Sequence, residues 1–268
     1  MNHSTLHQIL KKLHLSGLSE TLSVRLQEAA ANRLSHADFL ELVLQDELNI
    51  RGQRLLKRRV VAADFRQLRP LDEFDWSFNP SIDRKLIFEL AAGQFIRQHT
   101  DVLFVGPPGV GKTFLAQAIA YEALKMGFTV FYRSIFDLVR DFIREEAFGH
   151  QEKLLRKYLT PELLLIDDMG LKSLPKNSAE YLLEVIMRRY ENHSTIMTSN
   201  RPLEEWGKLL GDATSASAIL DRFLHHAQTI VIRGKSYRLR NQSAPPKPTE
   251  PKKQKREAEE SPTPEPTR

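Results

Sequence analysis

Residues 106–113 place glycines, a lysine and a hydroxyl side chain at the spacing used to bind nucleotide phosphates. They read Gly106-Pro107-Pro108-Gly109-Val110-Gly111-Lys112-Thr113. In such a Gly-x-x-x-x-Gly-Lys-Thr loop the backbone N–H groups surround the phosphates, the lysine reaches the β- and γ-phosphates, and the hydroxyl ligates Mg²⁺. We therefore expect this loop, with Phe114 directly after it, to bind ATP or GTP together with Mg²⁺.

Two carboxylates and an amide complete a candidate catalytic set. Asp167 and Asp168 follow the apolar run 163–166, and Asn200 follows the apolar run 195–198. An acid at the end of a buried strand beside a phosphate loop is typical of a Walker B element, because ligands of open α/β sheets lie outside the carboxyl ends of the strands. We expect Asp167 to hold Mg²⁺, Asp168 to polarise the attacking water, and Asn200 to orient that water.

The elements that must position these residues alternate between apolar strands and helical segments. Five short apolar runs read as strands, at 102–105, 129–132, 163–166, 195–198 and 229–232, and a helix is expected from about 82 to 98. Strands joined by crossover helices form a parallel sheet that is covered on both faces. The fold class expected is therefore α/β, with a five-stranded parallel sheet.

Residues 1–75 show helical periodicity without strand-like alternation, which predicts a small all-helical N-terminal domain before an ATPase domain at 76–240. The segment 51–69 holds seven basic residues against one acid, Asp64. We interpret it as a surface for the DNA backbone, because no paired carboxylates relieve its charge in the sequence. The candidate contacts are Arg51, Arg54, Lys57, Arg58 and Arg59. A solvated helix face is the alternative.

Composition limits the remaining function classes. The chain has no cysteine, so disulfides and thiol catalysis are excluded, and its net charge of +5 is compatible with a polyanionic partner. No apolar run approaches the roughly 18–20 residues of a membrane span. We expect a soluble, cytoplasmic protein without a membrane partner. Residues 241–268 hold seven of the 14 prolines and are expected to form a disordered tail.

An ordered set of motifs carries a family resemblance. The phosphate loop is followed by Leu-Ile-Asp-Asp-Met-Gly, Thr-Ser-Asn-Arg-Pro, Ile-Leu-Asp-Arg-Phe and Gly-Lys-Ser-Tyr-Arg, and it is preceded by Leu-x-Leu-Ser-Gly-Leu at 13–18 and Phe-Asp-Trp-Ser-Phe-Asn-Pro at 74–80. In this order, over about residues 5–240, the chain resembles the IstB-like transposition helper ATPases of the AAA+ class. These are relatives of the DnaC-type helicase loaders.

The resemblance implies a P-loop ATPase of the AAA+ fold that forms a homo-oligomer with ATP sites at subunit interfaces. Arg222 then corresponds to the arginine finger supplied by a neighbouring subunit, and Arg238 to the sensor-2 arginine that reads the nucleotide. The implied function is to oligomerise on duplex DNA and to recruit or activate a transposase of the same element, with ATP hydrolysis controlling the assembly.

Three other functions stay open on the sequence. A DnaC-like replicative helicase loader shares the motifs but would prefer single-stranded DNA. A small-molecule phosphoryl transferase shares the phosphate loop but has no use for the basic segment 51–69. A scaffold that binds ATP without hydrolysing it follows if Asp168, shorter than the Glu of many relatives, does not reach the water.

Overall fold

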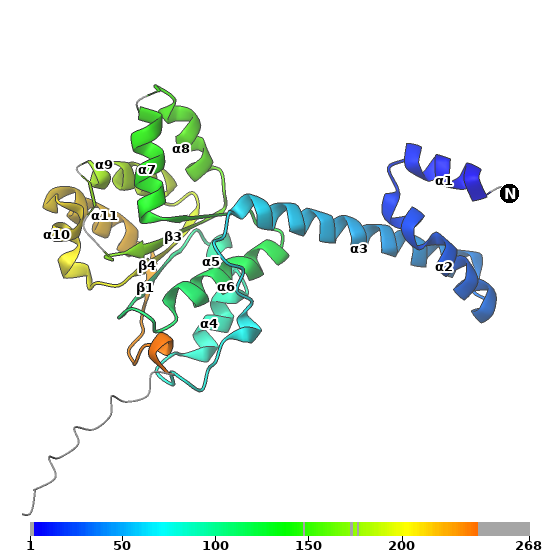
Figure 1. The fold of residues 1–268 in the computed structure, drawn as a ribbon, viewed down its shortest axis with the longest axis horizontal. Helices are drawn as coiled ribbons and strands as arrows, with labels where there is room; N and C mark the ends of the chain where they lie inside the picture. The colour runs from blue at the N-terminus through cyan, green and yellow to red at the C-terminus, as the bar shows by residue number, and fades with distance from the viewer. Residues whose placement is uncertain (1–2, 147, 172–173, 176, 241–268) are drawn as a thin grey trace, which may run out of the picture.

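The computed structural model describes residues 3–146, 148–171, 174–175 and 177–240. An α/β body forms the larger part, and a helical arm built from the N-terminal residues projects from it (Figure 1). The expected tail at 241–268 lies outside the described residues. Among the helices that the structure describes, none combines the length and the apolar character that crossing a membrane requires.

The body is built on one parallel sheet of five strands, in the order β2-β3-β4-β1-β5. The prediction of five parallel strands is confirmed, with shifts only at the strand ends. Because β1 pairs with β4 and β4 with β3, the carboxyl ends of these three strands meet at one edge. The strands are β1 (Asp101–Val105), β2 (Val130–Ser134), β3 (Leu163–Met169), β4 (Ser194–Ser199) and β5 (Ala227–Val231).

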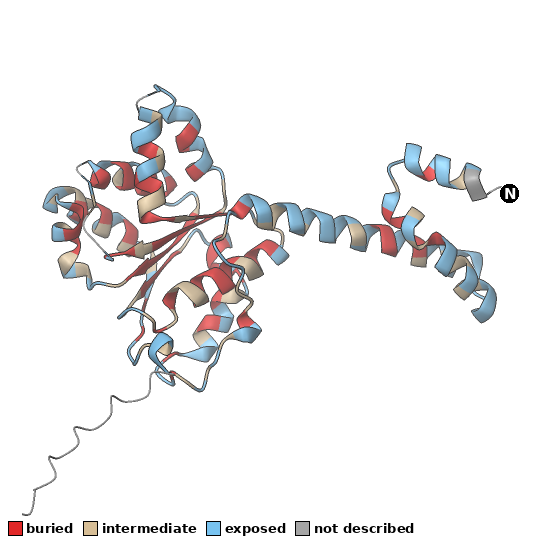
Figure 2. Ribbon diagram, in the orientation of Figure 1, coloured by how far each residue is buried: buried red, intermediate tan, exposed pale blue. Residues whose placement is uncertain are grey.

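Helices cover both faces of the sheet, so β1 to β4 are buried on both sides, while the edge strand β5 is largely exposed (Figure 2). Along β1, Val102 and Phe104 face one apolar cluster while Leu103 faces the other, as the period of two requires. One face carries α4 (Arg84–Ala91), α5 (Gln94–Arg97) and α6 (Lys112–Lys125). The other carries α7 (Ile135–Glu146), α8 (Gln151–Leu159), α9 (Ser178–Arg189), α10 (Trp206–Leu210) and α11 (Ala213–His225). In the described part of the chain, 3₁₀ turns lie at Leu71–Glu73, Leu203–Glu205 and Tyr237–Leu239.

The prediction of one continuous helix at 82–98 is wrong, because the chain divides there into α4 and α5. Gly93, between the two helices, has a φ of 73°, which is the left-handed region that ends helices. A Cβ atom at this position would lie 2.6 Å from Met126 Cε. Both the backbone conformation and the close approach of α6 therefore require glycine at the break.

The arm consists of α1 (His3–Lys12), α2 (Ser16–Asn32) and the long α3 (His36–Ala63). Its small core joins four buried side chains from the three helices: Leu10, Leu18, Leu22 and Val43. The Ser35 side chain caps α3 by accepting a 3.2 Å hydrogen bond from the Asp38 N–H, which satisfies one free donor of the first turn. The middle of α3 is mostly exposed between this core and the body (Figure 2).

The end of α3 is anchored on the body. Leu56, Val60 and Ala63 pack against the apolar cluster that also contains α4 and α6. The segment that follows α3 stays on the body, since Leu71 and Phe74 join the same cluster. These residues fall within the range 1–75 assigned to the N-terminal domain, but they pack as part of the nucleotide-binding body.

Candidate functional site

The phosphate loop leaves the end of β1 and enters α6 through backbone conformations that favour glycine. Gly109 has a φ of 83° and Gly111 a φ of 106°. A Cβ on Gly109 would lie 2.0 Å from Ser236 Oγ, and a Cβ on Gly111 would lie 2.9 Å from a ring carbon of Phe74. Glycine is therefore required at both positions by the backbone conformation and by the approach of Ser236 and Phe74.

The side chains of Lys112 and Asn200 meet at this loop. Lys112 is only 4% exposed, and its Nζ donates 2.8 Å hydrogen bonds to the carbonyl oxygens of Gly106 and Pro107 and to Asn200 Oδ1. Burial lowers the pKa of Lys112 to about 8, against the opposing pull of nearby carboxylates. An ammonium at the start of α6 can bind a phosphate held by the loop, and Asn200 is hydrogen-bonded to that ammonium.

Thr113 and Asp167 form the second pair of the site. The Thr113 hydroxyl donates to Asp167 Oδ1 at 2.9 Å, and Asp167 is 1% exposed. Asp167 also accepts hydrogen bonds from the Thr198 hydroxyl and, at 3.2 Å, from the Tyr132 hydroxyl. A hydroxyl and a carboxylate side by side are the hard oxygen ligands that Mg²⁺ uses beside phosphates, so the donor set fits this ion.

Asp168 occupies an unusual backbone position. Its φ of 68° is left-handed, and the pairing of β3 with β4 shifts register between Ile166 and Met169. The Asp168 N–H donates a 3.2 Å hydrogen bond to the Thr198 hydroxyl oxygen. Left-handed conformations of non-glycine residues cost free energy and cluster at functional sites, so this one marks the carboxylate as a candidate functional group. Burial raises the pKa of Asp168, and the neighbouring Asp167 charge raises it further.

These five polar residues line one cleft of about 470 Å³, which is within the size range of ligand sites. Arg238 lines the same cleft, and its charge contributes to the lowered pKa of Lys112. Four aromatic side chains that contact one another in pairs also line the cleft: Phe74, Phe78, Phe114 and Tyr237. Of the other loop residues, Pro108 and Val110 also line the cleft, and Val110 is buried against the core.

Arg222 lies at the opposite end of the sheet from this cleft. It stands near the end of α11, just before β5 begins, whereas the phosphate loop follows the carboxyl end of the parallel neighbour β1. Its guanidinium carbon is 5.6 Å from the centre of the Tyr190 ring. Arg222 therefore does not reach the phosphate loop of its own chain. An arginine-finger role requires a second subunit, as predicted from the resemblance.

The basic residues of α3 fall into two groups. The interpretation that their charge is unrelieved is wrong for two of them, because each has a carboxylate partner outside the segment 51–69. Arg51 pairs with Glu47 at 2.5 Å and donates to the His14 carbonyl oxygen, and Arg54 pairs with Glu20 at 2.5 Å.

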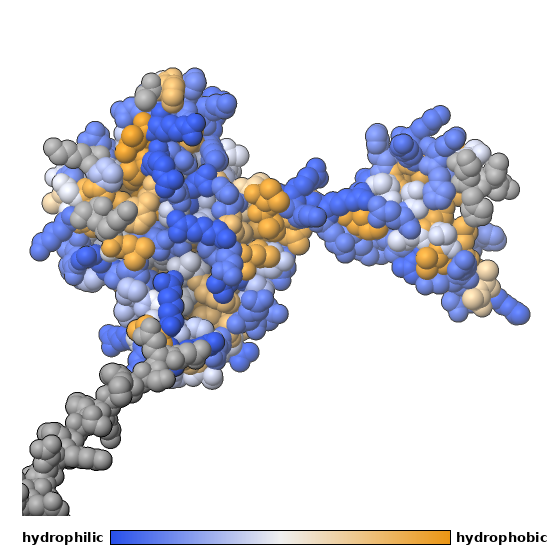
Figure 3. Space-filling model, viewed as in Figure 1, coloured by the Kyte–Doolittle hydropathy of each residue, from blue (hydrophilic) through white to orange (hydrophobic). Residues whose placement is uncertain are grey.

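The other basic residues of α3 differ in exposure. Lys57 and Arg58 are exposed and have no ion-pair partner among the residues described, whereas Arg59 is half-buried near Gly127 at the base of the arm. In the view of Figure 3, hydrophilic side chains cover one side of the arm between the body and the N-terminal helices. Lys57 and Arg58 share a shallow depression on α3 with Arg51 and Arg54.

Three further residues reach the site that the sequence analysis did not identify. Tyr132 on β2 and Thr198 on β4 are buried and donate to Asp167; burial and the Asp167 charge raise the pKa of Tyr132, which keeps its proton in place. The apolar runs 129–132 and 195–198 of the sequence end at these two residues, which could have indicated them. Arg66 donates to Asp168 from the segment after α3, and nothing in its local sequence signals that contact.

Comparisons with known proteins agree with this geometry. The family model described as IstB-like ATP binding protein matches residues 8–245. The chain is 38% identical to an ATP-binding protein of insertion sequence IS5376 from Geobacillus stearothermophilus, over 88% of this chain and 94% of that protein. It is 36% identical to the corresponding protein of insertion sequence IS21 from Pseudomonas aeruginosa, over 88% of this chain and 89% of that protein.

Solved structures support the AAA+ fold of the body. The DnaC helicase loader superposes with a TM-score of 0.52 at 28% identity, over 61% of this chain and 96% of that chain. AMPPCP-bound DnaA from Aquifex aeolicus superposes with a TM-score of 0.52 at 23% identity, over 63% of this chain and 51% of that chain. With the phosphate loop, the Asp167 strand and a matching family model over most of its length, the chain belongs to the IstB-like ATP-binding proteins of insertion sequences.

Proposed function

We propose that this protein hydrolyses ATP to control its assembly, as a homo-oligomer, on duplex DNA, where it recruits or activates the transposase of its insertion sequence. The observation that carries the proposal is the convergence of the Lys112–Asn200 and Thr113–Asp167 pairs in one cleft, each joined by a hydrogen bond under 3 Å. Together these pairs supply a phosphate-binding cation, an oriented amide and oxygen ligands for a metal.

Each residue then has a chemical task. When bound, Mg²⁺ neutralises charge on the β- and γ-phosphate oxygens. Thr113 and Asp167 are the residues that would hold it. Lys112 binds the phosphates, Asn200 orients the water, and Asp168 accepts its proton. Arg222 of a neighbouring subunit would stabilise the charge that spreads over the γ-phosphoryl group, which makes hydrolysis depend on assembly.

DNA binding is supported by the exposed cations of the arm. Lys57 and Arg58 are free of acidic partners among the described residues and stand on a helix that projects from the body (Figure 1). Contacts of this kind go to the phosphate backbone, so binding should be salt-sensitive and largely independent of sequence. The relatives' names place them in insertion sequences, which supports transposition as the process served.

A helicase loader is the second candidate, favoured by the superposition of the body on the DnaC helicase loader. The two functions differ in the DNA that they engage, since a loader acts where single strands are exposed. The small-molecule transferase and the non-hydrolysing scaffold differ from both, because neither predicts ATP turnover that DNA stimulates.

The test is phosphate release by wild type and Asp167→Asn, each without DNA, with duplex and with single-stranded DNA. We expect duplex DNA to stimulate wild-type turnover and Asp167→Asn to be inactive. Glu184→Gln is the matched control, because this exposed carboxylate on α9 pairs with Arg188 away from the cleft. Stimulation by single strands alone supports a helicase loader, and phosphate release that DNA does not change contradicts the proposal. Capture of the element's own transposase on DNA-bound protein then tests recruitment.

A further inference from the structure

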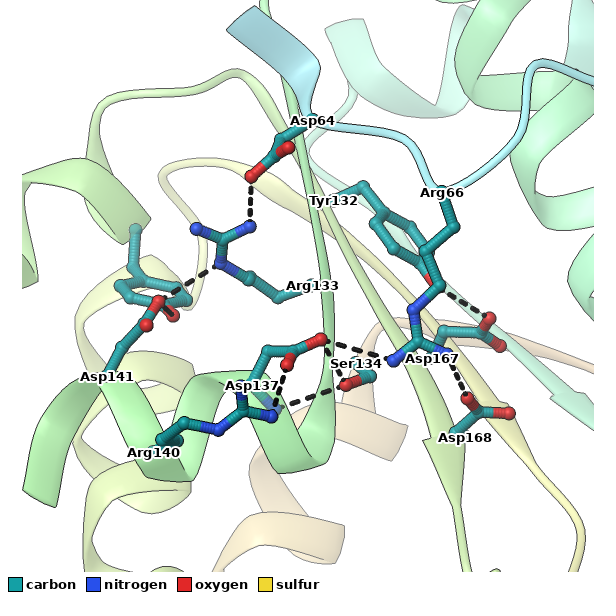
Figure 4. Close-up of polar contacts among 11 residues, drawn as sticks. Asp64, Arg66, Tyr132, Arg133, Ser134, Asp137, Arg140, Asp141, Asp167 and Asp168 are labelled. Carbon is teal, nitrogen blue, oxygen red and sulfur yellow. Dashed lines mark hydrogen bonds and ion pairs between the residues drawn. The ribbon is translucent and has the colours of Figure 1, made fainter.

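The segment that connects the arm to the body passes directly over the Walker B carboxylates. Arg66, three residues after the end of α3, donates from one guanidinium nitrogen to Asp168 Oδ2 and from the other to Asp137 Oδ2, each at 3.2 Å (Figure 4). Asp137 is held in turn by the Ser134 hydroxyl at 2.6 Å and by Arg140 at 2.7 Å. Arg66 therefore bridges a fixed carboxylate at the start of α7 and the candidate catalytic carboxylate on β3.

A second contact anchors the last turn of α3 to the same place. Asp64 ends α3 in a left-handed conformation, and its carboxylate accepts from Arg133. Arg133 lies on β2 directly before Ser134, which pairs in register with Asp167 on β3. Arg133 also donates to Asp141 Oδ2 at 3.0 Å. The end of the arm is thus fixed to the strand beside the ATP site by one ion pair, and Arg66 follows two residues later.

The chain between Asp64 and Arg66 is too short to absorb a movement of the arm. Successive Cα atoms are about 3.8 Å apart, so two residues give the connection only a small reach. A displacement of the end of α3 by a few ångströms must therefore move Arg66 as well. A shift of the end of α3 on the body is thus the movement that would change the contact at Asp168.

The Arg66–Asp168 pair is also of a kind that can be broken. The Arg66 side chain is 53% exposed, and exposed ion pairs are held weakly. While the pair is formed, Asp168 Oδ2 is held by the guanidinium, so this oxygen is not free to contact the attacking water.

We propose that Arg66 is a positioning residue that restrains Asp168, and that loading of DNA on the arm withdraws Arg66 and so frees Asp168 for ATP hydrolysis. This inference rests on the proposed function, since it needs both hydrolysis and DNA binding. Two contacts would link DNA on α3 to the ATP site: the ion pair of Asp64 with Arg133 and the ion pair of Arg66 with Asp168. The opposite role, in which Arg66 assists hydrolysis by contacting phosphate, predicts the opposite result on truncation.

The first test compares turnover of wild type, Arg66→Ala and Arg66→Lys, with and without duplex DNA. Arg66→Ala should raise kcat without DNA by about two- to fivefold, the range set by loss of an exposed ion pair, with KM for ATP unchanged. Its stimulation by DNA should fall by a similar factor. Arg66→Lys should lie between the two, because an ammonium keeps the charge but not the fork that bridges two carboxylates.

Arg140→Ala is the matched control. It removes a cation from Asp137, the same partner that Arg66 uses, but leaves Asp168 untouched. This variant should keep the wild-type basal rate and stimulation. A raised basal rate in Arg140→Ala as well would mean that loosening α7, rather than freeing Asp168, accelerates hydrolysis, and would overturn the inference.

A second readout does not depend on turnover. Amide hydrogen exchange of residues 64–69 should increase in wild type when duplex DNA and a non-hydrolysable ATP analogue are added together, and the analogue should bind Arg66→Ala as tightly as wild type. If wild type is stimulated by DNA while Arg66→Ala shows an unchanged or reduced basal rate, the restraint is refuted and the proposed function stands. If DNA does not stimulate wild type, the proposed function itself fails and the inference fails with it.

Discussion

Binding of ATP should draw a proton onto Lys112. In the free protein burial lowers the pKa of this lysine to about 8, and its ammonium donates to two carbonyl oxygens and to Asn200. The phosphates of ATP bring negative charge to the same position, which favours the charged form and returns the pKa to 10.5 or above. At pH 9 the free lysine is then roughly one-tenth protonated and the bound lysine almost fully, so binding takes up about 0.9 proton.

The sign of the effect fixes how affinity depends on pH. Below pH 8 the lysine is charged in both states, so this group adds no pH dependence. Above pH 8 the free protein loses the proton while the complex retains it, and the affinity for ATP falls by up to about tenfold per pH unit. Burial raises the pKa of Asp101 to about 7, but this residue begins β1 at the end of the strand away from the phosphate loop. Its titration falls near neutrality and is therefore separate from the effect of Lys112 on ATP affinity above pH 8.

Isothermal titration calorimetry measures this uptake directly. Titrations of ATP at pH 9 in two buffers with different heats of ionisation give the number of protons exchanged. Lys112→Arg is the control, because a guanidinium stays charged in both states and should remove the uptake. If wild type takes up no proton at pH 9, Lys112 is either charged in the free protein or not in contact with the phosphates, and the reasoning fails.

Three further predictions follow from single positions. Gly109→Ala forces a Cβ to 2.0 Å from Ser236 Oγ at a φ of 83°, so it should lower the free energy of unfolding by about 1–3 kcal/mol and weaken ATP binding at least about tenfold. Gly52→Ala, in open space on α3, should change neither quantity. Equal behaviour of the two variants would contradict the steric explanation. Arg222→Ala should lose turnover alone yet regain part of it when mixed with Lys112→Ala subunits, whereas normal turnover alone would exclude a finger in trans. Removing the charges of Lys57 and Arg58 together should reduce the salt slope of duplex binding by about 2, and an unchanged slope would remove them from the DNA interface.

Much of the body follows from local sequence. Each strand is a short apolar run between turn residues, and the phosphate loop dictates a strand before it and a helix after it. Asp167 and Asn200 were predictable because polar residues at the ends of parallel strands meet at one edge of the sheet. The contacts of Lys112 with Asn200 and of Thr113 with Asp167 follow once the strand order is β3-β4-β1.

The remainder depends on contacts between distant segments. Arg66 and Asp168 are 102 residues apart, and the left-handed backbone at Asp168 arises from a register shift between two strands that no local pattern encodes. The pairing of Arg54 with Glu20 likewise needs α2 folded against α3, which is why a count of charges within 51–69 overestimated the free positive surface. Local pattern located the ATP site, while tertiary packing decided which cations remain free.

If the proposed function is correct, nucleotide bound at this site controls binding to duplex DNA. Fluorescence anisotropy of labelled duplex and single-stranded DNA, titrated with wild type and Lys112→Ala in ATP and in ADP, tests it most directly. We expect tight, salt-sensitive duplex binding by wild type in ATP, and weak binding in ADP or by Lys112→Ala. Duplex binding that is the same in both nucleotides and in both proteins would contradict it.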